Sequence, residues 1–134
     1  MKDKVLDYIK NILEVPRSEY NGMSVCPFAK KERETDNIFF DIIGDSNSFI
    51  ECMDNFIKTD KNSAVFIQKG DYNVPEEYTK PYQKFLNSLL KENKLNHWKA
   101  LCINPNDKLD VDGFNARALS PCFLVLINNK TDIY

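Results

Sequence analysis

A cysteine with a proline directly after it and basic residues close behind is the part of this sequence that most resembles a reactive site. The stretch SVCPFAKKE, residues 24–32, places Cys26 before Pro27, which keeps Cys26 out of helical geometry. Lys30, Lys31 and Arg33 follow, and positive charge stabilises a thiolate, the nucleophilic and metal-binding form of cysteine. We therefore expect Cys26 to be a catalytic residue, with Lys30 as a ligand-binding neighbour. The plainer alternative is that Cys26 is a small buried residue where a loop meets the core.

The long polar segment before the last apolar run, residues 105–121, holds a second candidate site. A guanidinium such as that of Arg117 donates two parallel hydrogen bonds to a carboxylate, phosphate or propionate group. Asn115 lies two residues before it and offers an amide. Long loops in compact domains are often functional, so we expect Arg117 and Asn115 to bind an anionic group. The alternative is a solvent-facing arginine. The acids between 107 and 112 lack the glycine and glutamate spacing of a calcium loop.

His97 is the single histidine of the chain. It is the one candidate for a general base or an axial iron ligand, although a lone histidine beside Trp98 is more often a packed or surface residue. The other cysteines, Cys52, Cys102 and Cys122, form no CxxC pair and have no zinc-finger spacing. We expect reduced thiols, most of them buried, and no metal site.

Length and composition indicate one domain over residues 1–134. The chain is 43% hydrophobic and 28% charged, with a formal net charge of −2, which argues against general binding to nucleic acid. No apolar run approaches the roughly 20 residues of a membrane span, and acids interrupt the apolar pattern of the N-terminus, so we expect no membrane partner and a cytoplasmic location. The sequence leaves open whether the protein forms a homodimer.

Hydrophobic periodicity alternates between helix and strand along the chain. It predicts an α/β domain, with α+β left open, built from three main helices and a four-stranded mixed sheet. The expected helices are residues 3–14, 45–59 and 74–93, and the expected strands are 37–43, 63–70, 97–104 and 122–128. We expect Asp3 to cap the first helix, Asp45 or Ser46 to cap the second, and Pro81 to break or kink the third.

Two short motifs resemble a bacterial family of uncharacterised function whose members carry an early Cys-Pro-Phe-Ala motif and a late Asn-Arg-Ser-Pro-type segment. The likeness covers about residues 20–132 and implies no stated chemistry. The residues that carry it are Cys26, Pro27, Phe28 and Ala29, then Asn104 and Pro105 with Asn in place of the family's His, and finally Asn115, Arg117, Ser120 and Pro121.

More distantly, the Cys-Pro-Phe order resembles, in reverse, the Phe-Pro-Cys segment of the haem-dependent N-hydroxylases of arginine-derived natural products. The stretch YQKFLNSLL, residues 82–90, is similar to a helix of those enzymes. This resemblance implies an oxidoreductase that uses haem, with Cys26 or His97 as the iron ligand and Arg117 or Lys30 on a propionate.

The expected function is therefore to bind, or act on, a small anionic or zwitterionic molecule where the Cys26 and Arg117 loops meet, with haem-dependent redox chemistry as one version. The alternative is a non-catalytic binding or protein-interaction module in which Cys26 is structural.

Overall fold

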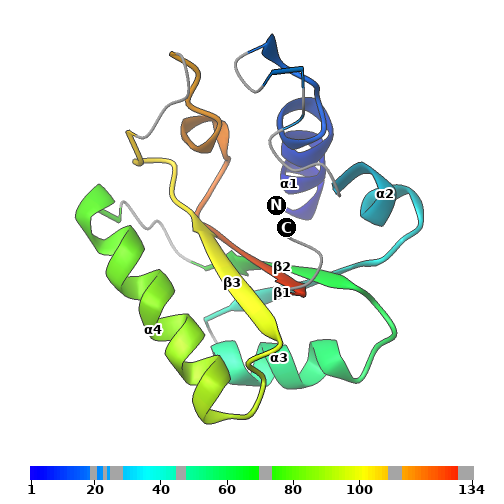
Figure 1. The fold of residues 1–134 in the computed structure, drawn as a ribbon, viewed down its shortest axis with the longest axis vertical. Helices are drawn as coiled ribbons and strands as arrows, with labels where there is room; N and C mark the ends of the chain where they lie inside the picture. Colours follow the sequence, from blue (N-terminus) through cyan, green and yellow to red (C-terminus); the bar gives the residue numbers. More distant parts are fainter. Residues whose placement is uncertain are drawn as a thin grey trace.

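A four-stranded mixed sheet forms the centre of the protein (Figure 1). This computed structural model describes residues 1–18, 21–22, 24, 29–44, 48–69, 74–108 and 113–129. The strand order is β1-β2-β4-β3; β1 and β2 are parallel, and β4 is antiparallel to both of its neighbours. The predicted α/β class and mixed sheet are confirmed. The strands are β1 Ile38–Ile43, β2 Ser63–Gln68, β3 Trp98–Ile103 and β4 Leu124–Asn129.

Helices cover both faces of this sheet (Figure 1). One face carries α3, Phe49–Ile57, and α4, Thr79–Glu92. The other carries α1, Lys2–Tyr8, which continues as the π-helical turn η1, Ile9–Leu13. These are the three main helices that the periodicity predicts. The short helix α2, Ala29–Glu34, was not expected, because residues 17–35 show no clean apolar period.

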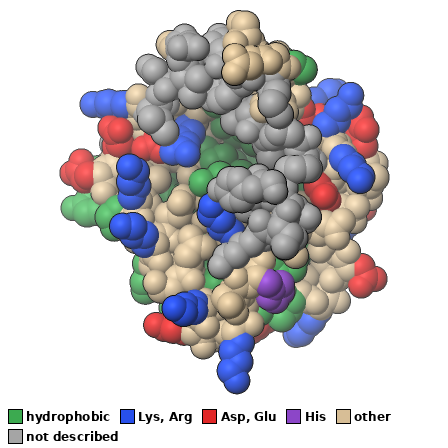
Figure 2. Space-filling model, viewed as in Figure 1, with side chains coloured by type: hydrophobic (Ala, Val, Ile, Leu, Met, Phe, Trp, Pro, Cys, Tyr) green, Lys and Arg blue, Asp and Glu red, His purple; other side chains and the backbone are tan. Residues whose placement is uncertain are grey.

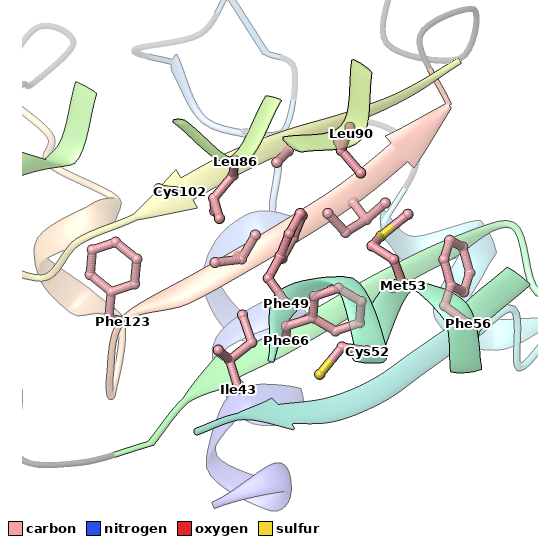
Figure 3. Packing of buried hydrophobic residues seen from close by; sticks show 14 residues of the cluster. Ile43, Phe49, Cys52, Met53, Phe56, Phe66, Leu86, Leu90, Cys102 and Phe123 are labelled. Atoms are coloured by element: carbon pink, nitrogen blue, oxygen red, sulfur yellow. The ribbon is translucent and has the colours of Figure 1, made fainter. Parts of the chain in front are cut away.

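The uninterrupted apolar strands are explained by burial on both faces. Successive side chains of a strand point to opposite sides, so Phe66 packs against α3 and α4 while Val65 packs against α1 and η1. Figure 3 shows Phe49 of α3 beside Phe66, with ring centroids 6.0 Å apart in an edge-to-face arrangement. The almost unbroken apolar run of β2 agrees with its central place in the sheet, between β1 and β4.

Three expected helix boundaries differ from the structure, each for a local reason. Ser48 caps α3, its side chain accepting a hydrogen bond from the backbone N–H of Glu51, so the expected cap at Asp45 or Ser46 was wrong. Asp3 lies inside the first turn of α1, where a carboxylate favours the positive end of the helix dipole. Pro81 does not break α4, because the helix begins at Thr79 and a first-turn residue needs no N–H partner.

The outer edge of β3 is covered by amide side chains of α4. Gln83 accepts a hydrogen bond from the backbone N–H of Cys102 at 2.9 Å. One turn later, Asn87 accepts from the N–H of Ala100 at 2.9 Å and donates to the carbonyl of Ala100 at 3.0 Å. An unpaired strand edge is a site for unwanted pairing, so these two amides complete the sheet on this side.

The strand directions bring three chain segments to one edge of the sheet. Strands β1, β2 and β3 run the same way and β4 runs against them. The carboxyl ends of β2 and β3 and the amino end of β4 therefore lie together. The start of α4 follows β2, and the polar β3–β4 connection, residues 104–123, begins and ends here (Figure 1).

Replacing Asn87 by Ala should lower the free energy of unfolding by about 1–3 kcal/mol, because the partly buried N–H and carbonyl of Ala100 lose their partner. Urea unfolding measures the change. The matched control is Asn93→Ala, whose amide bonds only to its own helix, at Leu89; an equal loss in both variants would contradict the role given to Asn87.

Candidate functional site

A groove lies between the start of α4 and the β3–β4 connection, at the carboxyl edge of the sheet. Its volume is about 630 Å³, within the roughly 300–1,000 Å³ of small-molecule sites. Charged and polar side chains line it: Glu76, Glu77, Thr79, Lys80, Gln83, Asp107, Lys108 and Arg117. The groove therefore contains Arg117, which the sequence had singled out.

The ion pair between Arg117 and Asp107 is the central contact of the groove. Nη1 of Arg117 donates to Oδ2 of Asp107 at 2.9 Å. The Asp107 side chain is only 8% exposed, whereas that of Arg117 is 32% exposed. A buried carboxylate needs a charged or hydrogen-bonding partner. Asp107 thus fixes the guanidinium, and part of the Arg117 side chain stays exposed where it lines the groove.

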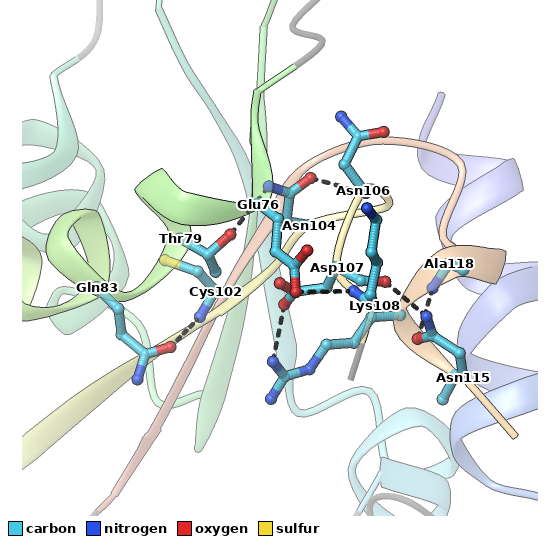
Figure 4. A network of polar contacts seen from close by, with 12 residues as sticks. Glu76, Thr79, Gln83, Cys102, Asn104, Asn106, Asp107, Lys108, Asn115 and Ala118 are labelled. Carbon is cyan, nitrogen blue, oxygen red and sulfur yellow. Dashed lines mark hydrogen bonds and ion pairs between the residues drawn. The ribbon is translucent and has the colours of Figure 1, made fainter. Parts of the chain in front are cut away.

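Asn104, at the carboxyl end of β3, joins the two walls of the groove (Figure 4). Its Nδ2 donates to Oγ1 of Thr79 at 2.9 Å and to the carbonyl of Val74 at 3.0 Å, both from the segment that begins α4. Its Oδ1 accepts from the backbone N–H of Asn106, and its carbonyl accepts from that of Asp107. Because Asn104 is 1% exposed, it holds the loop rather than a ligand.

Asn115 positions the same loop. Its Nδ2 donates to the carbonyl of Asp107, and its Oδ1 accepts from the backbone N–H of Ala118 at 3.2 Å, in the short 3₁₀ turn Arg117–Leu119. Both ends of the Asn115 amide are therefore bound to backbone, and Asn115 does not line the groove. Asn115 and Arg117 both bind Asp107, one at its backbone carbonyl and the other at its carboxylate, but the Asn115 amide faces the loop itself.

Two residues of the N-terminal segment, Tyr8 and Arg17, contact the loop that carries Arg117. The hydroxyl of Tyr8, a residue only 4% exposed, donates to the carbonyl of Ala116 at 2.8 Å. The guanidinium of Arg17 lies over the ring of Phe114, 3.4 Å from its centroid. Contacts of this cation–π kind are favourable, and they link the segment that precedes Cys26 with the loop that carries Arg117.

Cys26 itself lies outside the described residues, so its place relative to Arg117 stays a prediction. Lys30 is exposed in the first turn of α2. Arg33 forms a two-pronged ion pair with Glu14, which raises the pKa of the guanidinium and connects α2 to η1. The charge of Arg33 is thus bound to Glu14, and of the three cations expected near the thiol, Lys30 and Lys31 are without an ion pair among the described residues.

The three described cysteines are free and poorly suited to thiolate chemistry. Burial, with a smaller contribution from the charge of Asp41, raises the pKa of Cys52 to about 12. Burial likewise raises the pKa of Cys102 to about 12 and raises that of Cys122. Cys52 and Cys102 are buried and Cys122 is half-buried, so among the cysteines of the chain Cys26 stays the candidate for thiolate chemistry.

His97 does not belong to the groove. It is exposed in the turn before β3, whereas Arg117 approaches the opposite end of that strand, roughly 17 Å away at about 3.4 Å per residue. His97 and Arg117 therefore do not share the groove; a haem-binding role of His97 stays a prediction, and we derive no step through haem. Among the described residues, no group of three or more His, Cys, Asp or Glu side chains is placed to hold a metal ion.

Comparisons with protein-family models, with curated proteins and with solved structures found no match for this chain. A search of the described helices for one long and apolar enough to cross a membrane found none.

Sequence reasoning missed most of the groove. Asp107 was considered only among the acids of a calcium loop whose spacing does not match. The signal that could have found the groove residues is topological: polar residues that follow strands β2 and β3 meet at the carboxyl edge of the sheet, where ligands of α/β proteins bind.

In a Cys26→Ser variant, the native protein should react with a thiol reagent at neutral pH far more slowly than free cysteine, because burial keeps Cys52, Cys102 and Cys122 protonated. In denaturant, all three thiols should react at the ordinary rate. A fast native thiol in this variant would show that the described cysteines are not held in this way.

Tyr8→Phe should lower the free energy of unfolding by about 1–3 kcal/mol, because the buried carbonyl of Ala116 loses its donor. The control is Tyr78→Phe, since the side chain of Tyr78 is 57% exposed and its change should be near zero. Thermal and urea unfolding measure both variants, and equal stability of Tyr8→Phe and wild type would contradict the anchoring role.

Proposed function

We propose that this protein binds a small carboxylate-bearing molecule, anionic or zwitterionic, in the groove between the start of α4 and the β3–β4 connection. The observation that carries the proposal is the state of Arg117. Asp107 binds one of its nitrogens, Nη1, and the other two have no partner among the described residues.

The free side of the guanidinium has the geometry of a carboxylate site. With Nη1 on Asp107, the neighbouring Nε and Nη2 can donate two parallel hydrogen bonds to one planar anion. The ion pair holds Arg117 in place before a ligand arrives, which lowers the entropy cost of binding. Lysine, as a point charge on a flexible stem, would not offer this fork.

A catalytic version of the proposal depends on Cys26. The three other thiols are held protonated by burial, so a thiolate step at this site would use the cysteine of the Cys-Pro-Phe segment. Arg17 on Phe114 supports the nearness of that segment to the groove, because Arg17 belongs to the chain that leads into it. In the non-catalytic version, the groove binds its ligand and Cys26 only packs.

Isothermal titration with hexanoate and its zwitterionic analogue ε-aminocaproate tests the proposal. At least one should bind to the wild type, Arg117→Lys should weaken it by about tenfold, and Arg117→Gln should weaken it further. Lys91→Gln, at the far end of α4 and outside the groove, is the control and should bind like wild type. Absence of binding, or binding that ignores Arg117, would overturn the proposal.

A further inference from the structure

We infer that the ligand of this groove is a zwitterion of amino-acid type, with its carboxylate on Arg117 and its protonated amine on the acidic wall formed by Glu76 and Glu77. This inference rests on the proposed function and narrows its ligand class from any small carboxylate to one that also carries a positive charge.

The charges that line the groove are balanced but largely unpaired. Three side chains are acidic and three are basic. In the described part of the chain, Asp107 and Arg117 pair with each other, and the side chains of the remaining four form no ion pair: Glu76, Glu77, Lys80 and Lys108. Opposite charges that share a groove without neutralising one another can each meet a complementary charge on a ligand.

This balance separates the ligand classes. A phosphate or a dicarboxylate on Arg117 would bring added negative charge that Lys80 or Lys108 could meet, but it would leave the carboxylates of Glu76 and Glu77 without a positive partner. A simple amine would leave the guanidinium fork unused. A molecule with one charge of each sign satisfies both walls, so the lining favours a zwitterion over an anion.

Hydrogen bonds to two consecutive loop residues, Asp107 and Lys108, fix the two walls of the groove relative to each other. Oε1 of Glu76 accepts from the backbone N–H of Lys108 at 3.2 Å, and Lys108 directly follows Asp107, which holds Arg117 at 2.9 Å. Figure 4 shows Glu76, Asp107 and Lys108 gathered at this point. Glu76 and Arg117 are therefore each bound to one of two consecutive residues, so a single short ligand can reach both.

On the face shown in Figure 2, basic and acidic side chains of the described residues are interspersed, including on the side that α4 occupies. The preference for a zwitterion therefore comes from the side chains that line the groove and not from a general charge of that face.

The test compares four probes of similar size by isothermal titration: ε-aminocaproate and norleucine, which carry both charges at long and short separation, hexanoate, which lacks the amine, and hexylamine, which lacks the carboxylate. At least one zwitterion should bind about tenfold more tightly than hexanoate, because it adds a charge-assisted contact. Glu77→Gln should remove that advantage and leave hexanoate binding unchanged. Glu92→Gln, at the other end of α4, is the control and should preserve both.

The outcomes separate the two proposals. Hexanoate that binds as tightly as both zwitterions, with Arg117→Gln or Arg117→Lys weakening all three, would overturn the zwitterion inference and leave the carboxylate site standing. An advantage for a zwitterion that persists in Glu77→Gln and Glu76→Gln would also overturn the inference. Failure of all four probes, or hexylamine binding as tightly as the zwitterions, would overturn both. Thermal unfolding of each variant checks that it is folded.

Discussion

The ion pair between Asp107 and Arg117 is the contact on which the site depends. In its described part the β3–β4 connection has little regular structure beyond the 3₁₀ turn Arg117–Leu119, so it is held by side chains: Asn104 at its start, Asn115 within it and Tyr8 from the N-terminal layer. Asp107 is largely buried, and a buried carboxylate without its cation would be strongly unfavourable. The pair therefore fixes the loop and, at the same time, holds Arg117 where it lines the groove.

Sheet topology puts this pair where it can act. Because β4 is inserted antiparallel between β2 and β3, the chain must return over the carboxyl edge of the sheet to begin it. The same edge receives the start of α4, and α4 is held along β3 by Gln83 and Asn87. The two groove walls are thus attached to one rigid strand, β3. The wall that α4 begins is held along the side of β3, and the wall formed by the β3–β4 connection follows from its carboxyl end. A small change in α4 would move one wall, and a change in the loop would move the other.

Local patterns predicted the elements, and long-range contacts decided the site. Apolar period and β-branched runs were enough for the four strands and for the three main helices, because burial on each face follows from side-chain alternation. Strand order could not be predicted, since no local signal says that β4 pairs with both β2 and β3. Arg117 was identified from its residue type. Its partner Asp107 was not identified, because it lies ten positions earlier in the sequence and no local pattern connects the two. The structural roles of Asn104 and Asn115 also became visible only when their hydrogen bonds across the fold were known. The convergence of Cys26 with this groove stays a prediction.

A double-mutant cycle on Asp107 and Arg117 tests the central claim most directly. The free energy of unfolding is measured in urea for wild type, Asp107→Asn, Arg117→Gln and the variant with both changes. If the pair holds the loop, the two single changes are not additive, and the coupling is about 1–3 kcal/mol, as for a partly buried charge-assisted hydrogen bond. Additive losses, the behaviour of an exposed ion pair of no consequence, would contradict the account.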